Sequence, residues 1–484
     1  MSTIAVIGAG FSGTLLSLHL LRRCPPGTRV RLIERNRQFG RGQAYATGNP
    51  SHLLNVPAGR MSAFRDRPHD FLDWLQKQPV REGGGPVEAG HFIPRREFGA
   101  YVRYLLNEEL KRPDLGETLE LVGGDVLGIG QAGRRLSLQL DRERTVEADS
   151  AVLAVGNVPP EPPKVRDGGF YDGPLYRPDP WAADALSDLD PQAPVLLIGT
   201  GLTMVDVAVS LLDQGHRGPI HALSRRGLLP LRHVAGVAQP PGEPRALPAS
   251  VGGLTRLLRH EAARAMRAGG DWRPVIDGVR PFTTDVWQAM PLADRARFLR
   301  HMRPWWDIHR HRMPGPTAHR INDACERAQL TVRAGRIQGY VPDMQGVRVV
   351  YRPRFQDAPA SIRAARVVNC SGPGTDYDRI AHPLVRSMLR QGMVRPDPLR
   401  LGLDVTGNCA LLDGEGAVSR RLFAVGPVTK GAFWEMTAVP DIRRQCEFLA
   451  GHLASLAAPA VQAASAGSSG APCMIGRGEI GRGE

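Results

Sequence analysis

Two glycine-rich turns, each directly after a short apolar run, constrain this chain more than any other feature. The first, residues 8–13 (Gly-Ala-Gly-Phe-Ser-Gly), follows the run 4–7, and the second, residues 199–203 (Gly-Thr-Gly-Leu-Thr), follows the run 195–198. A strand–turn–helix unit of this kind aims backbone N–H groups and a helix start at a phosphate. Two such units predict two nucleotides held face to face, the arrangement that passes a hydride from a nicotinamide to a flavin.

The residues after the first turn favour an adenine dinucleotide there. A helix is expected over 14–23, and the next apolar run, 30–33, ends in Glu34, 24 positions after Gly10. A carboxylate at that point can accept hydrogen bonds from both ribose hydroxyls while the helix start faces the pyrophosphate. A lone GxGxxG is weak evidence, but the strand, helix and acid together make it strong. We therefore predict an FAD site whose contacts include Gly8, Gly10, Phe11, Ser12, Gly13, Glu34 and Arg35.

The second turn differs at the equivalent acidic position. Its second apolar run, 220–223, ends in Ser224-Arg225-Arg226, so arginine replaces the acid. An acid would repel a 2′-phosphate, whereas arginine can pair with it bidentately, which favours NADPH over NADH without excluding NADH. The alternative is that Arg225 and Arg226 are two exposed surface residues. The predicted contacts of this nucleotide are Gly199, Gly201, Thr203, Ser224, Arg225 and Arg226.

Later segments complete the predicted FAD site. The runs 119–122, 125–127 and 136–140 indicate an antiparallel meander that places the backbone of Val126 near the adenine and leads to a buried strand ending in Gly156. A further strand ends in Gly426 and leads through Trp434 and Thr437 into a last helix. The positive end of that helix would stabilise negative charge on the N1–O2 edge of a reduced flavin.

Together these segments predict an α/β fold with two dinucleotide-binding domains of the three-layer Rossmann type and a helical insertion. At 484 residues the chain is too long for one hydrophobic core. We expect an FAD-binding domain at 1–160 and 366–455, an NAD(P)-binding domain at 161–250 and 321–365, the helical insertion at 251–320, and a disordered tail at 456–484.

Cysteine usage and targeting signals exclude several classes. No two of the six cysteines have C-x-x-C spacing, which argues against a disulfide reductase and against structural zinc, so no metal is predicted. No basic and apolar leader opens the chain, and no apolar run approaches the roughly 20 residues of a membrane helix. We expect a soluble cytoplasmic protein without a membrane partner.

The positive charge of the chain is concentrated in one region. The formal net charge is +14, and residues 251–320 hold 13 arginines against 6 acidic residues. Because there is no lysine-rich tail and no RNA-binding or zinc-finger pattern, a nucleic acid partner is not expected. The excess is either an arginine-rich surface or an anion-attracting pocket. Candidate substrate contacts are Arg303, His309, Arg310 and Arg312, and their alternative role is helix-surface and interdomain packing.

Several segments read together resemble one family. They are residues 40–46 (GRGQAYA), 52–61 (HLLNVPAGRM), 199–206 (GTGLTMVD), 224–230 (SRRGLLP), 305–312 (WWDIHRHR) and 433–443 (FWEMTAVPDIR). In these segments the chain resembles the FAD-NAD(P)-binding proteins grouped with a bacterial flavin-dependent urate hydroxylase and an L-aspartate N-monooxygenase. Residues 93–101 (IPRREFGAY) are similar to a segment of the N-hydroxylating monooxygenases. Two departures are that the F-x-G-x-x-x-H signature of flavin-containing monooxygenases is absent, and that Gly426-Pro427 replaces the usual Gly-Asp pair.

The resemblance implies a single-component flavin monooxygenase. FAD reduced by NADPH would react with O₂ to give a C4a-(hydro)peroxyflavin, which hydroxylates a small, anionic, nitrogen-containing substrate such as urate or an amino acid. No acid–base side chain is identified, and Asn55, in the loop expected beside the isoalloxazine, is a candidate flavin contact. Two alternatives stay open. One is an NAD(P)H:acceptor reductase, and the other is a non-catalytic FAD-binding redox sensor, against which the complete second nucleotide site counts.

Overall fold

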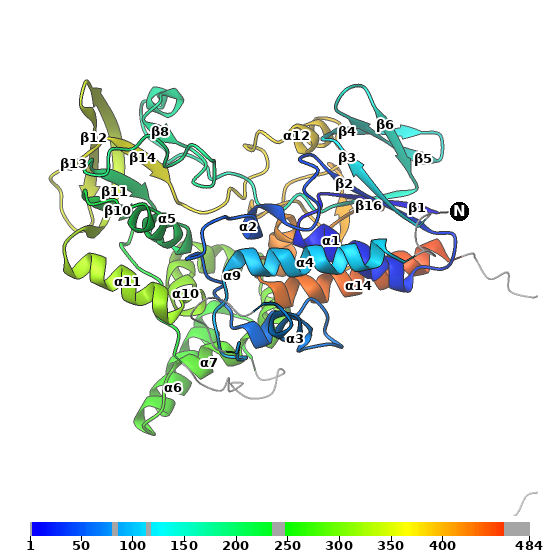
Figure 1. Ribbon diagram of the computed structural model, residues 1–484, viewed down its shortest axis with the longest axis horizontal. Helices are drawn as coiled ribbons and strands as arrows, with labels where there is room; N and C mark the ends of the chain where they lie inside the picture. Colours follow the sequence, from blue (N-terminus) through cyan, green and yellow to red (C-terminus); the bar gives the residue numbers. More distant parts are fainter. Residues whose placement is uncertain (1, 80–85, 113–117, 235–246, 459–484) are drawn as a thin grey trace, which may run out of the picture.

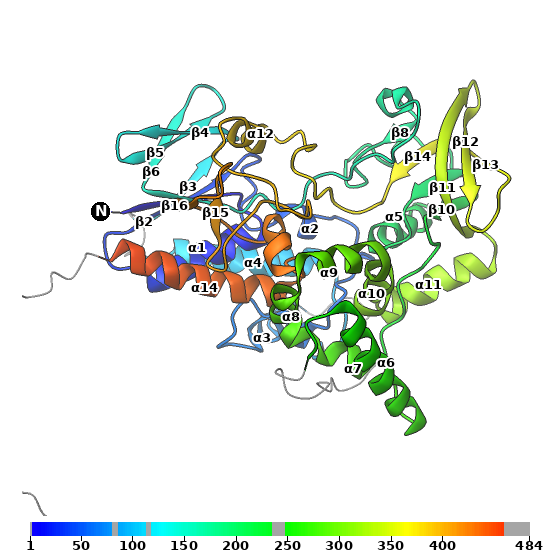
Figure 2. The same cartoon turned by 180° about the vertical axis from the view of Figure 1, so that it is seen from behind.

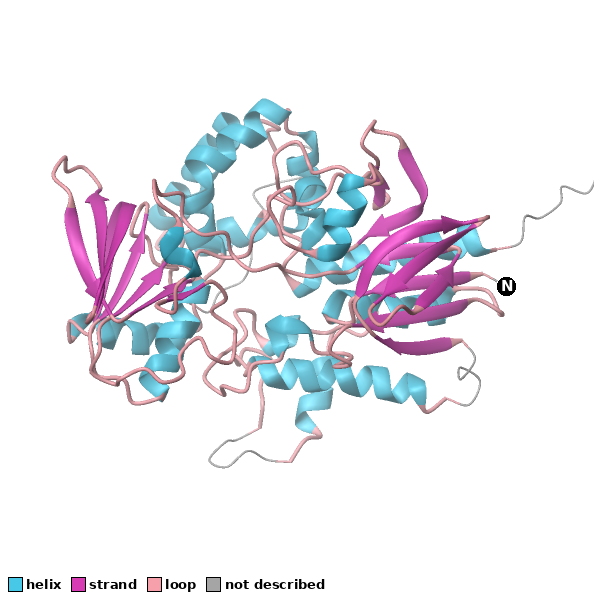
Figure 3. Ribbon diagram, turned by 90° about the horizontal axis from the view of Figure 1, so that it is seen from above, coloured by secondary structure: helices cyan, strands magenta, loops and turns pink. Residues whose placement is uncertain are grey.

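Two mostly parallel sheets lie at opposite ends of the molecule, with helices between and beneath them (Figures 1 and 3). The computed structural model describes residues 2–79, 86–112, 118–234 and 247–458. The chain visits the first sheet, crosses to the second, and returns to the first, so each domain contains segments far apart in sequence. This confirms the predicted α/β class with two parallel-sheet domains.

The first sheet has the strand order β15-β16-β7-β1-β2-β3, with only β15 antiparallel. Its strands are β1 (Thr3–Ile7), β2 (Arg29–Glu34), β3 (Leu119–Gly123), β7 (Ser150–Leu153), β15 (Ala410–Leu412) and β16 (Val418–Ala424). Strands β1 and β2 and the helix between them fall where the sequence predicts, except that the helix begins at Phe11, three residues early. It therefore starts directly after Gly10, which places its free N–H groups at the turn.

Helices cover one face of this sheet, and a small three-stranded sheet with a helix covers the other. On one face α1 (Phe11–Arg23) lies beside α4 (Arg95–Leu110) and α14 (Val439–Ala457), and on the other lies the meander of β4 (Val126–Ala132), β5 (Arg135–Leu140) and β6 (Thr145–Ala148) with α12 (Pro383–Arg390) (Figures 1 and 2). The shorter elements of this half are α2 (Gly42–Tyr45), η1 (Ala58–Arg60), α3 (Asp70–Gln76), η7 (Pro427–Thr429) and α13 (Lys430–Phe433).

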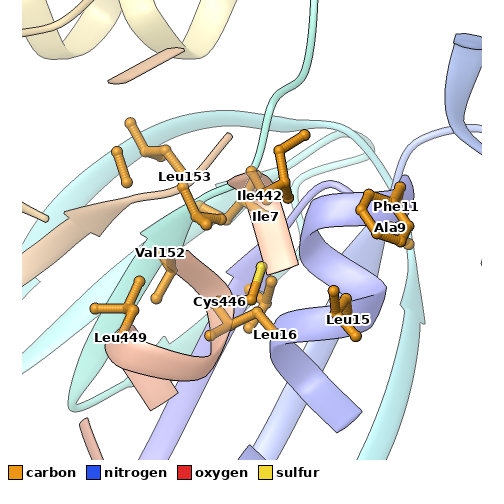
Figure 4. Close-up of a cluster of buried hydrophobic side chains, with 14 of the residues drawn as sticks. Ile7, Ala9, Phe11, Leu15, Leu16, Val152, Leu153, Ile442, Cys446 and Leu449 are labelled. Atoms are coloured by element: carbon orange, nitrogen blue, oxygen red, sulfur yellow. The ribbon is translucent and has the colours of Figure 1, made fainter. Parts of the chain in front are cut away.

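Helix α14 joins the end of the chain to its start. Its apolar side chains Ile442, Cys446 and Leu449 recur at helical spacing and pack between α1 and the strands β1 and β7 (Figure 4). All three are buried, and the Cys446 thiol donates to the Ser12 carbonyl at 3.4 Å. The sequence places a disordered tail from residue 456, but α14 runs to Ala457 and residues 459–484 lie outside the described range.

The second sheet has the order β13-β12-β11-β10-β9-β14-β8. Its strands are β8 (Tyr176–Arg177), β9 (Val195–Ile198), β10 (Ile220–Ser224), β11 (Leu330–Asp343), β12 (Gly346–Pro353), β13 (Ala360–Ala364) and β14 (Arg366–Asn369). Strand β14 pairs in parallel with β9 and β8, so the prediction that the first domain resumes at residue 366 is wrong. Strands of both domains share the sequence pattern of β14, a buried apolar run that ends in a glycine turn. Only the strands with which β14 pairs show to which domain it belongs.

The chain returns to the first domain just after β14. There Val158, on the outgoing connection, forms an isolated antiparallel bridge with Gly374, on the returning one. The two connections between the domains therefore run side by side.

The helical insertion is shorter than predicted. It contains η5 (Arg280–Phe282), the π-helical η6 (Phe298–Met302) and helices α6 (Val251–Arg267), α7 (Arg273–Gly278), α8 (Thr283–Ala289), α9 (Leu292–Arg297) and α10 (Arg303–Arg310). Helix α11 (Gly315–Glu326) packs with α5 (Leu202–Asp213) in the core of the second domain, so the boundary predicted at residue 320 cuts through a helix of that domain. The remaining short element, η3 (Gly169–Asp172), lies in the connection before β8. No helix among the described residues combines the length and apolarity that crossing a bilayer requires.

Gly13 sets how closely α1 approaches the end of β1. A Cβ atom added at Gly13 would lie 1.8 Å from the Gly8 carbonyl oxygen. Gly8 itself has φ +103°, and a Cβ there would lie 2.4 Å from the Ala154 carbonyl oxygen. The turn therefore requires glycine for close backbone approach.

Replacing Gly13 with alanine is expected to lower the free energy of unfolding of the ligand-free protein by about 1–3 kcal/mol, because the added methyl overpacks a rigid backbone contact. The matched control is Gly201→Ala, since Gly201 has φ −85° and no atom within 4 Å of an added Cβ. Urea unfolding measures both. Equal destabilisation by the two variants would contradict this account of the first turn.

Candidate cofactor and substrate site

The first glycine turn and the end of β2 are in direct contact. The Glu34 carboxylate accepts the Ala9 N–H at 2.8 Å and the Asn36 N–H at 3.3 Å, so it reaches back across the turn. In the register of β2 with β3, Glu34 lies opposite Gly123, three positions before Val126. The structure thus brings together the predicted pyrophosphate, ribose and adenine contacts. Arg35 is exposed beside them.

The closing strand β16 returns to the same turn. Gly426 has φ +82°, and a Cβ added there would lie 2.6 Å from the Ser12 hydroxyl oxygen. The Gly426 N–H donates to Gln445 Oε1 of α14 at 2.8 Å. Phe11 packs its ring against Tyr45 and Phe98, so it offers the turn only its backbone N–H. Gly426 and Ser12, at the start of α1, therefore pack closely against one another.

The second turn lies between β9 and α5 as predicted. Its Thr200 hydroxyl lies 2.9 Å from the Ser224 hydroxyl, which in turn accepts the Gly227 N–H at 2.9 Å. Ser224 therefore shapes the loop after β10. Arg225 and Arg226 follow directly and form no hydrogen bond or ion pair with another described residue, and Gly201 opens onto empty space. Thr203 lies in the first turn of α5. The two guanidinium groups are free to meet an anion at this edge.

A pocket lies between the carboxyl ends of strands from both sheets. Gly156 follows β7 of the first sheet, Pro427 follows β16, and Ser371 to Thr375 follow β14 of the second sheet. Gly156 and Gly372 have φ +70° and +89°, and no atom lies within 4 Å of a Cβ added at either. The remaining lining residues are Asn157, Arg303, Tyr377, Leu401, Lys430 and Thr437.

The pocket and the two turns fit a pair of dinucleotides. Gly156 and Gly372 have no atom near the position of an added Cβ, so a planar ring can approach the backbone there. Neither glycine turn lines the pocket itself, but both lie at the same carboxyl-end edge of their sheets as the pocket. Of the predicted flavin contacts, Gly156 and Thr437 line this pocket.

Trp434 is held by the insertion rather than exposed to a ligand. Its ring stacks on Trp287 of α8 at 4.7 Å between centroids, and Trp287 Nε1 donates to the Gly431 carbonyl at 2.7 Å. Trp434 is 4% exposed and has φ +54°, a conformation that costs a non-glycine residue free energy. The stacking of the two indoles keeps that conformation in place.

Glu435, the next residue, is the centre of a buried charge network. It accepts hydrogen bonds from Trp306 Nε1 at 2.9 Å and from Arg310 Nε at 3.1 Å. Burial alone would raise the pKa of Glu435, but Arg310, His311 and Arg280 hold that pKa below its usual value. Arg280 also pairs with Asp441 of α14 at 3.2 Å. The charges of the insertion therefore bind the closing segment of the first domain.

Only one of the four predicted substrate contacts lines the pocket. Arg303 does so, whereas Arg310 is buried against Glu435 and Arg312 is buried in an ion pair with Asp277. His309 Nδ1 lies 2.8 Å from the Trp305 carbonyl, and its ring packs on Trp272. For His309, Arg310 and Arg312 the structure corrects the prediction in favour of packing, the alternative that the sequence left open. Asn55 lies outside the pocket lining, and its carbonyl is 3.0 Å from His233 Nε2.

A buried polar cluster that sequence reasoning did not single out joins the two domains. Arg95 at the start of α4 pairs with Asp206 of α5 at 2.8 Å, and His52 Nε2 lies 2.8 Å from the Ser210 hydroxyl. Burial raises the pKa of Asp206, with Arg95 and His52 acting in the opposite direction. Burial likewise lowers the pKa of His52. The signal was present, because Arg95, His52 and Asp206 all belong to segments that carry the family resemblance.

Comparison with known proteins agrees with this geometry. Residues 5–158 match the family described as FAD-NAD(P)-binding. This match covers about the first third of the chain. No curated protein sequence matches the chain.

Solved structures share the fold over nearly the whole of this chain. The ornithine hydroxylase of Pseudomonas aeruginosa is 15% identical with a TM-score of 0.63, and the ornithine N-hydroxylase of Kutzneria sp. 744 is 14% identical with a TM-score of 0.64. The bacillithiol disulfide reductase of Staphylococcus aureus is 11% identical with a TM-score of 0.54. Each comparison covers 94% of this chain and 99% of the other. Because the three enzymes include a reductase, the shared fold does not by itself select a reaction.

Replacing Arg95 with methionine is expected to lower the free energy of unfolding by about 3 kcal/mol, because it leaves the buried Asp206 carboxylate without its cation. The control is Arg96→Met, since Arg96 is half exposed and its ion pair with Glu97 at 3.5 Å is a surface one. Urea unfolding followed by tryptophan fluorescence measures both. If the two variants lose the same stability, the Arg95–Asp206 pair does not anchor the domains.

Proposed function

We propose that this protein is an FAD-dependent, NADPH-consuming monooxygenase that hydroxylates a small, nitrogen-containing anion. The observation that carries the proposal is a pocket with strand ends of both sheets in its wall, at the same edge of each sheet as a glycine turn. Two dinucleotides bound on the turns would meet there. The likeness in fold to two ornithine hydroxylases supports an amine as the group that is hydroxylated.

The residues of the first domain would bind and orient FAD. Backbone N–H groups at the start of α1 would receive the pyrophosphate, and the Glu34 carboxylate would exchange its bond to Ala9 for the ribose hydroxyls. When bound, FAD would supply the redox chemistry, taking a hydride from NADPH and activating O₂. Helix α14, with its positive end beside Thr437, would favour negative charge at the adjacent edge of the ring.

The residues of the second domain would bind NADPH. The start of α5 would receive its pyrophosphate, and Arg225 with Arg226 would pair with the 2′-phosphate. The insertion would close the pocket against water, since Arg303 of α10 lines it and Trp287 of α8 fixes Trp434 beside it.

The direct test is to purify the protein, identify its bound flavin, and follow NADPH oxidation and O₂ uptake with L-ornithine, L-aspartate or urate. The proposal predicts FAD and a hydroxylated product formed in step with NADPH use for an amine substrate. Rapid turnover with a quinone or dye, without an oxygenated product from any substrate, would establish the reductase instead. Bound FAD without NADPH oxidation would favour the redox sensor.

Replacing both Arg225 and Arg226 with alanine is expected to raise the KM for NADPH about 10- to 100-fold, because two charge-assisted contacts to the 2′-phosphate are lost. The KM for NADH should change little, since NADH lacks that phosphate. Arg217→Ala, at the opposite end of β10, is the control for a lost surface cation. Equal increases for the two nucleotides would refute the 2′-phosphate assignment.

A further inference from the structure

Lys430 lines the pocket, and its ammonium group has no hydrogen-bonding partner among the described residues. It begins α13, directly after the turn that follows β16, and is half-buried. Its Nζ atom lies 4.9 Å from the centre of the Trp434 ring. It donates no hydrogen bond to any residue in the described part of the chain, and no carboxylate there lies within ion-pair distance of it. A half-buried cation in this setting lacks the compensation that burial normally demands.

A second cation of the pocket lies over the same indole. The guanidinium carbon of Arg303 is 5.9 Å from the centre of the Trp434 ring, and its Nε atom is 3.5 Å from Asp307 Oδ2. Because Trp434 is fixed by its stacking on Trp287, it fixes both cations relative to the pocket. Lys430 and Arg303 come from segments 127 residues apart in sequence, so their convergence is a property of the fold.

The nearby carboxylates do not cancel this charge. Asp307 pairs with Arg303, and Glu435 is already bound by Arg310 and Trp306. His311 lies 4.0 Å from Asp307, and burial lowers its pKa, which favours the neutral ring. Across Lys430, Arg303 and Asp307 one positive charge is left over at the pocket wall.

We infer that Lys430 and Arg303 bind the carboxylate of the substrate, so that the substrate is an amine that also carries a carboxylate, as amino acids do. This inference rests on the proposed function and assigns the two residues that recognise the carboxylate group. A neutral amine or a diamine would leave both cations uncompensated and would bind more weakly.

The protonation of Lys430 gives the inference a pH signature. Burial, and next the charge of Arg303, lower the pKa of Lys430 to about 8, while Asp307 and Glu435 act in the opposite direction. The ammonium is therefore present at pH 7 and is lost as the pH rises through about 8. The carboxylate contact should weaken over the same range.

The test measures binding to the oxidised, FAD-loaded protein without NADPH, so that turnover is not needed. L-ornithine and its decarboxylated analogue 1,4-diaminobutane are titrated into the wild type, Lys430→Met, Arg303→Met and the control Arg300→Met, and heat release gives Kd. Arg300 is an exposed cation on the adjoining segment η6. We expect Kd for L-ornithine to rise at least tenfold in the first two variants and to stay unchanged in the control. Kd for the diamine, which both cations repel, should not rise in any variant and should fall in the first two.

A second readout isolates the lysine from the titration of the ligand. The ratio of Kd between Lys430→Met and the wild type is measured from pH 7 to pH 9.5, and it should fall towards one above pH 8. Unchanged affinity for L-ornithine in Lys430→Met, or a ratio that does not vary with pH, overturns the inference. A rise in the KM for NADPH in place of the Kd for L-ornithine also overturns it, because the pair would then bind a nucleotide phosphate. If the wild type forms hydroxylated product but the variants bind L-ornithine normally, this inference fails and the proposed function stands; if the wild type forms none with any amine, the proposed function fails.

Discussion

The buried ion pair of Arg95 with Asp206 is the contact on which the shared pocket depends. Two nucleotide sites can act on one another only if their domains keep a fixed orientation, and the interfaces between domains of one chain are usually polar and adjustable. Here a carboxylate from the second domain is buried against an arginine of the first. Because neither charge can be left alone in that environment, separating the domains at this point is costly, and the carboxyl ends of both sheets stay together.

Charge compensation explains which arginines of the insertion are structural. Arg310 and Arg312 each face a carboxylate inside the protein, and Arg280 faces another on α14. The pairs of Arg310 with Glu435 and of Arg280 with Asp441 hold the insertion against the closing segment. Two cations line the pocket: Arg303, which pairs with Asp307, and Lys430, which has no ion-pair partner among the described residues. The sequence shows that arginines are in excess over acidic residues at 251–320. Only the ion pairs of the folded protein show which cations remain available to a ligand.

The elements that local patterns determine could be predicted, and those that depend on distant partners could not. The two turns, the helix α1 and the acid at the end of β2 follow from the spacing of glycines and apolar residues over about 30 positions, and they lie where expected. Strand β14 has the same local pattern as a strand of the first domain, so its place in the second sheet was not predictable. Arg310 could not be assigned because its partner Glu435 is 125 residues away. Lys430 was missed because one lysine in an arginine-rich chain carries no motif.

The isolated bridge between Val158 and Gly374 has a mechanical consequence. The two connections between the domains meet there. Asn157 on the outgoing connection and Thr375 on the returning one lie next to the bridge, and both line the pocket. Any rotation of the second domain against the first must turn about this paired crossing, because the chain has no other covalent path between the sheets in the described residues. A rotation about an axis along the pocket wall displaces the far end of the second domain most and the pocket least. The crossing and the buried Arg95–Asp206 pair therefore act together: the crossing sets the direction in which the second domain can turn, and the ion pair limits how far it turns.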